Sequence, residues 1–400
     1  MLAAFSTARP ITGVLSTAVR GPRAGLRNSE VPVIPKSDAN RDGAWAGFGP
    51  GWAPCAGKST ALLLCLTLLA CFPARATGDA REPRGVGYTE LEFVDSERSR
   101  TLETTLWYPA AENSNTTEQI YPSGFLGYAK RGAETLSGAG PRPLILLSHG
   151  DRGVNTNLAW LAERLADHEY LVVGVDHWLN TTRNNEPEET LRLWNRPLDI
   201  SFVLSRLLVD PVWGPRIDPS RIGVAGHSSG GYTAFALAGA IFDPEAMAAY
   251  CQSDSRGPDC ELAEGADLAK VDLSEASKSY RDERIRAAFA MAPAVGAGIR
   301  VTSLAEITTP VHVVTTRDDE LLDPDRNAMR YARNTPGAAL TIREEGGHFV
   351  YLSRCFLLTK IVTYFLEFDV CGTRSPVDRD PVHREIAELA VAFFDQNLEP

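Results

Sequence analysis

The sequence predicts an α/β domain with a mostly parallel central sheet flanked by helices. Continuous apolar runs of strand length recur along the chain, and stretches with apolar residues at helical spacing lie between them. Such runs are typical of parallel strands that are buried on both faces. Six of them predict strands at residues 143–148, 171–175, 222–225, 285–291, 310–314 and 340–342.

The pattern of apolar and polar residues also predicts the elements before and between these strands. Residues 88–94 and 101–108 alternate apolar and polar side chains, which predicts two antiparallel strands at the start of the domain. Helical spacing predicts helices at residues 157–168 and 384–394, and we also expect helices at 191–208 and at 232–240, a run of small, helix-tolerant residues. We therefore assign residues 77–400 to one α/β domain.

Residues 1–76 read as a leader that is disordered or removed. The apolar run 61–70 fits the hydrophobic region of a secretory signal, and Ala74 to Ala76 offers a cleavage site before Thr77. A lipoprotein signal is the alternative, because Leu68 to Ala70 precedes Cys71 as in a lipobox, and a lipid on Cys71 would attach the protein to a membrane. A buried helix or an organelle transit peptide are the other readings. We expect a secreted or periplasmic protein.

The cysteines agree with export. The domain holds an even number of them, which would pair in an oxidising compartment. Four cysteines allow three connectivities, and the simplest is Cys251 with Cys260 and Cys355 with Cys371. Four separate buried thiols are the alternative. No close pair of cysteines or histidines has the spacing of metal ligands, so no metal site is predicted.

Residues 242–283 interrupt the alternation of strands and helices. The segment is acidic, rich in Asp and Ser, and contains Cys251 and Cys260. We interpret it as an insertion that forms a cap or lid above the sheet, the alternative being a solvated loop with no role in binding. The formal net charge of −11 argues against nucleic acid as a partner.

The segment Gly226-His227-Ser228-Ser229-Gly230 joins a predicted strand to a predicted helix. This is the context of a nucleophile elbow, in which a sharp turn exposes a serine hydroxyl at the end of a sheet. Glycines at 226 and 230 fit because a side chain there would collide across the turn. The pentapeptide alone could be an ordinary Gly/Ser turn, but its context predicts that Ser228 is a nucleophile.

A serine nucleophile needs a base, and the base needs a carboxylate that orients it. Asp318 and Asp319 follow the strand at 310–314, and His348 follows Gly346-Gly347 after the last strand. The order Ser, acid, His is the one this architecture uses. We predict His348 as the base, in preference to His312 within a strand and His383 at the start of a helix. We choose Asp319 as the acid, with Asp318 as the alternative.

The oxyanion of the tetrahedral intermediate needs two preorganised donors. We predict the backbone N–H of Ser229, directly after the nucleophile, and that of Asp151 in the loop after the first buried strand. We expect His149 to support this loop rather than to transfer protons. Trp178, Tyr232 and Phe349 are candidates for an acyl pocket, although aromatic side chains near a sheet edge are often simple packing.

These segments together resemble the α/β-hydrolase superfamily. The resemblance rests on residues 106–110, 148–150, 175–177, 218–222, 226–231 and 346–349, and it covers about residues 88–398. Within the superfamily, the chain resembles exported dienelactone-hydrolase-like enzymes and their relatives, the platelet-activating-factor acetylhydrolases and lipases. Dienelactone hydrolases proper use a cysteine nucleophile, whereas Ser228 stands here, which puts lactone hydrolysis in doubt.

The resemblance implies a serine esterase that cleaves short acyl or lipid-like esters through an acyl-enzyme, without a metal or organic cofactor. The expected partner is a small-molecule or lipid ester substrate, and the sequence predicts no oligomeric state. A peptidase or amidase on the same fold and a non-catalytic binding protein are the alternatives.

Overall fold

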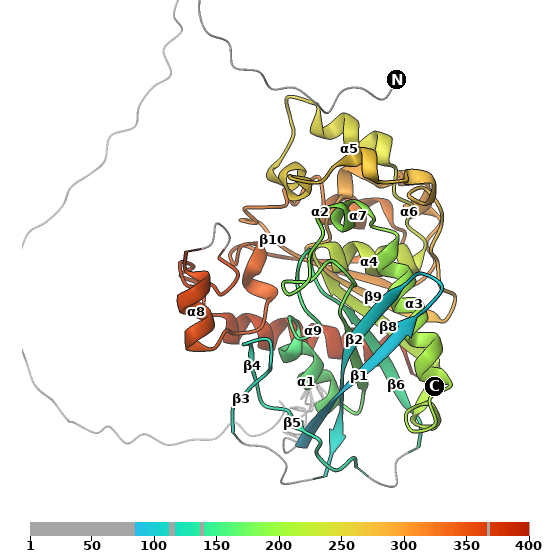
Figure 1. Ribbon diagram of the computed structural model, residues 1–400, viewed down its shortest axis with the longest axis vertical. Coiled ribbons are helices and arrows are strands. Elements are labelled where there is room, and N and C mark those ends of the chain that lie inside the picture. Colours follow the sequence, from blue (N-terminus) through green and yellow to red (C-terminus); the bar gives the residue numbers. More distant parts are fainter. Residues whose placement is uncertain (1–84, 112–116, 137–139, 366–368, 400) are drawn as a thin grey trace, which may run out of the picture. The chain divides into compact units, whose positions relative to one another are not determined.

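The computed structural model describes residues 85–111, 117–136, 140–365 and 369–399. The predicted leader, residues 1–76, lies outside the described residues together with Cys71 and the expected cleavage site. The described ranges form the α/β domain (Figure 1).

The domain is organised around one twisted sheet in the order β11-β10-β9-β8-β6-β7-β2-β1-β5. Its strands are β1 (Gly85–Asp95), β2 (Arg100–Ala110), β5 (Lys130–Arg131), β6 (Arg142–Ser148), β7 (Leu171–Val175), β8 (Ile217–His227), β9 (Ile285–Met291), β10 (Val311–Thr316) and β11 (Ala339–Arg343). A small separate sheet pairs β3 (Gln119–Ile120) with β4 (Leu126–Gly127). Each of the eight strands expected from the sequence is present.

The six strands from β7 across the sheet to β11 are parallel to one another, whereas β2 is antiparallel to both β1 and β7. β6 lies between β7 and β8, and every one of its residues is buried. Its side chains alternate between two cores: Leu144 and Leu146 face one, and Ile145 and Leu147 the other. This two-sided burial explains why its sequence is an unbroken apolar run, and the predicted α/β class is confirmed.

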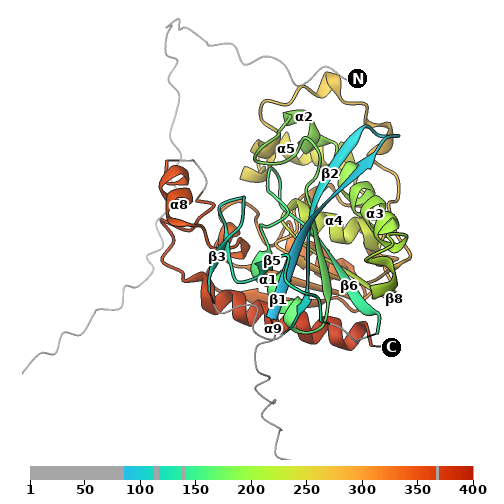
Figure 2. The same cartoon turned by 60° about the horizontal axis from the view of Figure 1, so that its bottom comes forward.

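Helices cover both faces of the sheet (Figures 1 and 2). They are α1 (Ala159–Asp167), α2 (Pro187–Leu191), α3 (Asn195–Leu208), α4 (Ser229–Ala238), α5 (Pro244–Cys251), α6 (Val301–Ala305), α7 (Ala328–Asn334), α8 (Leu357–Thr363) and α9 (Arg379–Asn397). Side chains of α1 and α9 fill one core, and those of α3, α4, α6 and α7 fill the other. Within the described residues, α8 alone among these helices has no buried residue.

The segment 242–283 holds α5 and three short 3₁₀ helices, at Pro258–Ala263, Leu268–Lys270 and Leu273–Glu275. A disulfide joins Cys251 to Cys260 within it, and a second joins Cys355 to Cys371 on either side of α8. The predicted pairing is therefore the one that the structure has.

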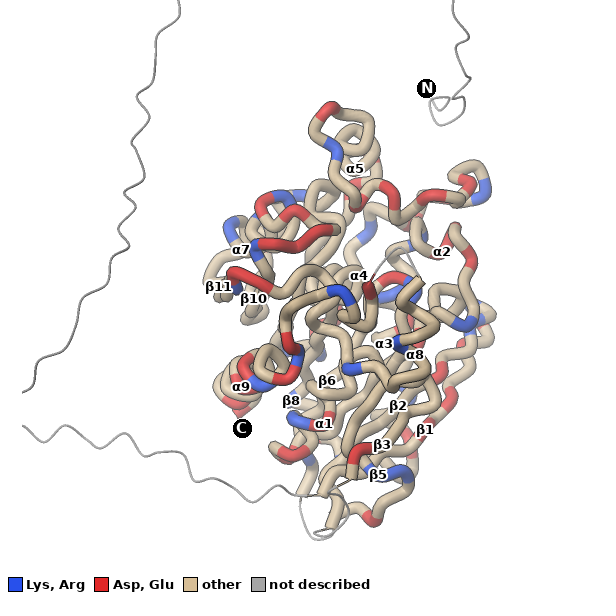
Figure 3. The backbone as a smooth tube through the Cα atoms, turned by 90° about the vertical axis from the view of Figure 1, so that its left-hand side faces the viewer, with Lys and Arg blue, Asp and Glu red and all other residues tan. Residues whose placement is uncertain are grey.

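Charged residues of both signs occur throughout the described chain. Lysine and arginine are interspersed with aspartate and glutamate along the chain trace (Figure 3). Among the described residues, none of the helices combines the length and the apolar character needed to cross a membrane.

Candidate active site

Ser228 occupies a strained turn between β8 and α4. Its φ and ψ are 58° and −121°, a conformation that non-glycine residues rarely adopt. Three backbone hydrogen bonds hold the turn: Ser228 N–H donates to Met291 O, and Ser228 O accepts from the amides of Tyr232 and Ala294, at 2.9 to 3.1 Å. A strained serine that is fixed by the surrounding backbone is what a nucleophile elbow requires.

The two flanking glycines are needed for steric reasons. A Cβ at Gly226 would lie 2.2 Å from Gly230 O, and a Cβ at Gly230 would lie 1.9 Å from Ser148 O. Both obstacles are backbone atoms, which cannot rotate away. The turn can therefore close on itself only with glycine at 226, and it can lie this close to β6 only with glycine at 230.

His348 and Asp319 form a buried pair. The Nδ1 of His348 lies 2.8 Å from Oδ2 of Asp319, and the His348 side chain is 1% exposed. The other carboxylate oxygen, Oδ1, accepts the backbone N–H groups of Leu321 at 3.0 Å and Leu322 at 2.7 Å. Because Oδ1 is engaged, Oδ2 is left to accept from Nδ1–H, and this tautomer leaves Nε2 as an acceptor.

The neighbouring acids hold the backbone of the same loop. Asp318 accepts from the amides of Gly346 at 3.1 Å and Gly347 at 2.9 Å, and Glu320 accepts from the amide of His348 at 2.7 Å. Three consecutive carboxylates therefore fix the histidine loop, but only that of Asp319 contacts the imidazole. This contact favours Asp319 over Asp318 as the acid, and its catalytic role stays a prediction.

His227 brings the elbow and the histidine loop together. Its ring lies 4.7 Å from the ring of His348, and its Nε2 lies 2.9 Å from His348 O. Burial lowers the pKa of His227 well below the usual value, so this ring is neutral and donates from Nε2. Among the hydrogen bonds of the described residues, none joins the Ser228 hydroxyl to His348. The role of Ser228 therefore stays a prediction.

The loop that follows β6 runs beside the elbow. A Cβ at Gly150 would lie 3.3 Å from the Ser228 Cβ. The Asp151 carboxylate accepts from Asn180 Nδ2 and Thr190 Oγ1, both at 2.8 Å, which fixes the loop. Within the described part of the chain, neither the Asp151 amide nor the Ser229 amide has a hydrogen-bond partner. Both predicted oxyanion donors are thus available.

Arg196 holds this loop through hydrogen bonds, a role that the sequence analysis did not predict. Its guanidinium is buried and donates to His149 O, to Gly150 O at 3.4 Å, and to Asn180 Oδ1 at 2.6 Å. Burial lowers the pKa of Arg196 to about 10. A signal was present, because Arg196 and Asp199 lie on the same face of α3 as its buried apolar residues.

A second series of hydrogen-bonded serine, histidine and aspartate side chains begins at Ser148, the last residue of β6 before the loop. Ser148 Oγ is 2.8 Å from His177 Nε2, and His177 Nδ1 is 3.0 Å from Asp199 Oδ2. All three residues are completely buried, so no substrate can reach the Ser148 hydroxyl. Arg100 pairs with Asp199 at 2.8 Å. His149 joins this network through its Nε2, which accepts from the His177 amide at 3.1 Å. The network supports the loop, as expected for His149.

The three predicted pocket residues lie in different surroundings. Tyr232 is 1% exposed and packs in the core beside Phe242, which favours a packing role. Trp178 is half-buried against the same core. Phe349 is half-buried and meets the His348 ring edge-on at 5.1 Å. Leu262, from the 242–283 segment, belongs with Phe349 to an apolar cluster that also contains Leu321 and Leu322.

Comparison with known proteins relates the chain to esterases over a limited stretch. No model of a known protein family matches it. Cutinase est2 of Thermobifida alba is 38% identical over 87 residues, which are 22% of this chain and 27% of the relative. Cutinase cut1 of Thermobifida fusca is 37% identical over the same length, 22% of this chain and 25% of the relative. The chain thus spans about a quarter of the length of the curated relatives it matches.

The likeness in three dimensions is broader. A ferulic acid esterase from Streptomyces cinnamoneus superposes with a TM-score of 0.51, covering 80% of this chain and 91% of that one at 22% sequence identity. At this identity the likeness bears on the fold. With the mostly parallel sheet and the turn between β8 and α4, it confirms the α/β-hydrolase fold expected from the sequence.

Proposed function

We propose that the protein is a serine hydrolase that cleaves carboxylic esters, with Ser228 as nucleophile, His348 as base and Asp319 as the orienting acid. The observation that carries this proposal is the buried His348–Asp319 pair at 2.8 Å, whose histidine lies against the residue that precedes Ser228. The names of the relatives agree with it, because cutinases and ferulic acid esterases are ester hydrolases.

In the proposed mechanism, His348 Nε2 accepts the proton of Ser228 as its oxygen attacks the ester carbonyl. The Asp151 and Ser229 amides stabilise the oxyanion, and Asp319 stabilises the imidazolium that forms. His348 then donates the proton to the leaving alcohol, and an acyl-enzyme remains. Water, deprotonated by His348, attacks this ester, and His348 returns the proton to the Ser228 oxygen as the acid leaves. We expect the Ser228–His348 hydrogen bond to form in the substrate complex, since catalytic hydrogen bonds often tighten only with substrate bound.

We propose short acyl or lipid-like esters as the substrate class. This follows the resemblance to the dienelactone-hydrolase-like and acetylhydrolase-like enzymes, which stays a prediction. The segment 242–283 would act as a cap, because Leu262 packs on the cluster beside His348 and Asp319. Trp178 and Phe349 remain the candidates for contact with the acyl group.

We also propose that the protein acts outside the cytoplasm. Two disulfides in one domain are typical of proteins that fold in an oxidising compartment. Whether the leader is cleaved before Thr77 or lipidated at Cys71 stays a prediction, which the mass of the mature N-terminus would decide.

A panel of p-nitrophenyl esters of increasing acyl length, with the matching anilides, tests the proposed function. We expect hydrolysis of short esters, far slower cleavage of the anilides, and no activity in Ser228→Ala. Ser148→Ala is the matched control: Ser148 is completely buried and out of reach of substrate, so the variant should lose no more than about tenfold in activity, the kinetic equivalent of one supporting hydrogen bond. Faster cleavage of anilides would favour an amidase, and a protein inactive on every ester would contradict the proposal.

A further inference from the structure

Helix α8 presents its apolar side to solvent. Six large side chains between residues 357 and 365 are more than half exposed, from 53% for Tyr364 to 83% for Phe365. They are Leu357, Leu358, Ile361, Val362, Tyr364 and Phe365. The four within the helix, Leu357, Leu358, Ile361 and Val362, fall on one side of its axis at 3.6 residues per turn, and Tyr364 and Phe365 follow directly after its end. A helix that packs on a domain normally turns this side inward, so α8 is inverted.

The polar side of α8 is the one that contacts the domain. Thr359, Lys360 and Thr363 are its half-buried residues. Thr359 Oγ1 donates to Gly124 O at 3.1 Å, and the amide of Phe356, just before the helix, donates to the same oxygen at 2.9 Å. The inverted orientation is therefore fixed by specific hydrogen bonds.

A disulfide holds the segment that carries α8 at both ends. Cys355 and Cys371 are buried and pack with Phe125 and Val154 in a small apolar cluster. The backbone of Cys355 also forms a β-bridge with Phe125. In Figures 1 and 2, α8 lies at the side of the domain, away from the central sheet. The apolar side is thus presented on a fixed support and not on a free tail.

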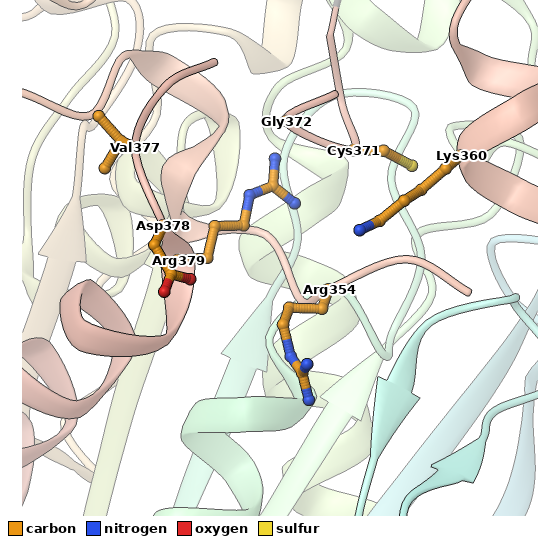
Figure 4. Close-up of a pocket in the computed structure, with 7 residues that line it drawn as sticks. All are labelled: Arg354, Lys360, Cys371, Gly372, Val377, Asp378 and Arg379. Atoms are coloured by element: carbon orange, nitrogen blue, oxygen red, sulfur yellow. The ribbon is translucent and has the colours of Figure 1, made fainter. Parts of the chain in front are cut away.

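A cavity of about 190 Å³ with cationic side chains lies beside α8. Arg354, Lys360 and Arg379 line it together with a single acid, Asp378 (Figure 4). Arg354 is paired with Glu118 and Asp380. Within the described ranges, however, Lys360 has no carboxylate partner. A small anion could occupy this space.

Arg379 is the buried cation of the cavity. It is 6% exposed, and its guanidinium donates to the carbonyl oxygens of Leu352, Ser353 and Val370 at 3.0 to 3.2 Å. These partners are neutral, and burial lowers the pKa of Arg379 to about 10. The Asp369 carboxylate offsets part of the cost of burying this charge, and an anion bound in the cavity would offset more of it.

We propose that the apolar side of α8 docks on the surface of a phospholipid layer that contains anionic lipid, with a headgroup phosphate held in the Arg354–Lys360–Arg379 cavity. The size of the surface favours lipid over a second protein. A seven-residue helix is only about 10 Å long, whereas a stable protein interface buries roughly 800 Å² on each partner. Insertion of apolar side chains into a lipid surface has no such minimum area, and basic residues beside an apolar face are typical of interfacial helices.

This docking is separate from the proposed ester hydrolysis and from a lipid anchor at Cys71. The formal net charge of −11 gives the whole chain no attraction to an anionic surface. Binding must therefore come from α8 and the cavity at short range.

The test is co-sedimentation of the full chain, carrying Cys71→Ser so that no anchor can form, with vesicles of phosphatidylcholine alone or with phosphatidylglycerol. We expect binding to the mixed vesicles and weaker binding to phosphatidylcholine alone. Replacing Leu358, Ile361 and Val362 by aspartate should weaken binding about a hundredfold or more, because three apolar contacts are lost and charge is added. These side chains are 54% to 63% exposed, so the fold should be unaffected.

Matched controls separate this surface from general hydrophobicity. Val209 and Val212 are 71% and 55% exposed and directly follow α3, which lies on the opposite side of the view from α8 in Figures 1 and 2. Their replacement by aspartate should leave binding unchanged. Lys360→Gln should reduce the preference for phosphatidylglycerol. The proposal is overturned if the wild-type chain binds neither vesicle, if the α8 variant binds as well as the wild type, or if the α8 variant only disperses a dimer. Ester hydrolysis of soluble substrates is unaffected in each case, so the two proposals fail separately.

Discussion

Replacing Asp319 by asparagine should abolish most of the activity, for a reason that can be worked out from its hydrogen bonds. Oδ1 of Asp319 accepts from the amides of Leu321 and Leu322, whereas Oδ2 faces His348 Nδ1. In the variant, the amide oxygen must take the Oδ1 position, because an NH₂ group there would face two N–H donors. The NH₂ group then points at Nδ1 and forces the proton onto Nε2, where it blocks transfer from Ser228.

The wrong tautomer and the lost charge should together lower kcat about 10³- to 10⁴-fold, or roughly 4 to 5.5 kcal/mol of transition-state stabilisation. KM should change little, since the carboxylate does not contact substrate. The assay is p-nitrophenyl ester hydrolysis with circular dichroism as a check on folding.

Asp318→Asn is the matched control. Asp318 contacts the amides of Gly346 and Gly347 and not the imidazole. The variant keeps one acceptor, and its loss of kcat should be about tenfold or less, the kinetic equivalent of one hydrogen bond of about 1 kcal/mol. The reasoning is refuted if Asp318→Asn is as inactive as Asp319→Asn, or if Asp319→Asn keeps more than about a tenth of the wild-type kcat.

Three further predictions concern residues outside the proposed triad. Arg196→Met removes the donor to the carbonyl oxygens of His149 and Gly150, so kcat should fall about 10- to 100-fold, with partial recovery in Arg196→Lys. Equal activity in the wild type and both variants would contradict this prediction. Gly230→Ala should prevent folding or lower the free energy of unfolding by more than about 3 kcal/mol, because its Cβ would lie 1.9 Å from Ser148 O. Gly140→Ala is the control: a Cβ there would have no atom within 4 Å, so the temperature of thermal unfolding should not change. Burial lowers the pKa of His383 to about 3 in the folded protein. Between about pH 6.5 and that value, the imidazole is protonated in the unfolded chain but not in the folded one. As the pH falls through this range, the free energy of unfolding therefore decreases by about 1.4 kcal/mol per pH unit. In His383→Gln, urea titrations between about pH 6.5 and 4 should show a smaller decrease in the free energy of unfolding with falling pH than in the wild type. The same pH dependence in both proteins would contradict this prediction.

The sequence predicted the sheet well because parallel strands buried on both faces leave a clear apolar signature. Residues 143–148 and 285–291 are recognisable without any partner, since nearly every side chain is buried. The helix after Ser228 was predicted from residue 232, but it begins at Ser229. Ser and Gly at its start have low helix propensity, and the tertiary contacts of the elbow override it.

The site was predicted only in part. Asp318 and Asp319 are adjacent acids after one strand, and no sequence pattern tells which carboxylate turns toward His348. The direction follows from long-range contacts, because Asp318 is held by the amides of Gly346 and Gly347. Arg196 was missed because an arginine in a helix is usually solvated, yet here its guanidinium is buried against the carbonyl oxygens of His149 and Gly150.

Helix α8 lay outside any expectation for a related reason. Apolar residues at helical spacing predict a buried face, but the four large apolar side chains of α8 are exposed to solvent, and only the structure reveals the inversion.

Covalent labelling of the full chain by a fluorophosphonate, followed by peptide mass spectrometry, tests the proposed site directly. We predict a single adduct on Ser228, no adduct in Ser228→Ala, and much slower labelling in His348→Ala. An adduct on another serine, or a wild-type chain that never reacts, would contradict the assignment of Ser228, His348 and Asp319 to one catalytic site.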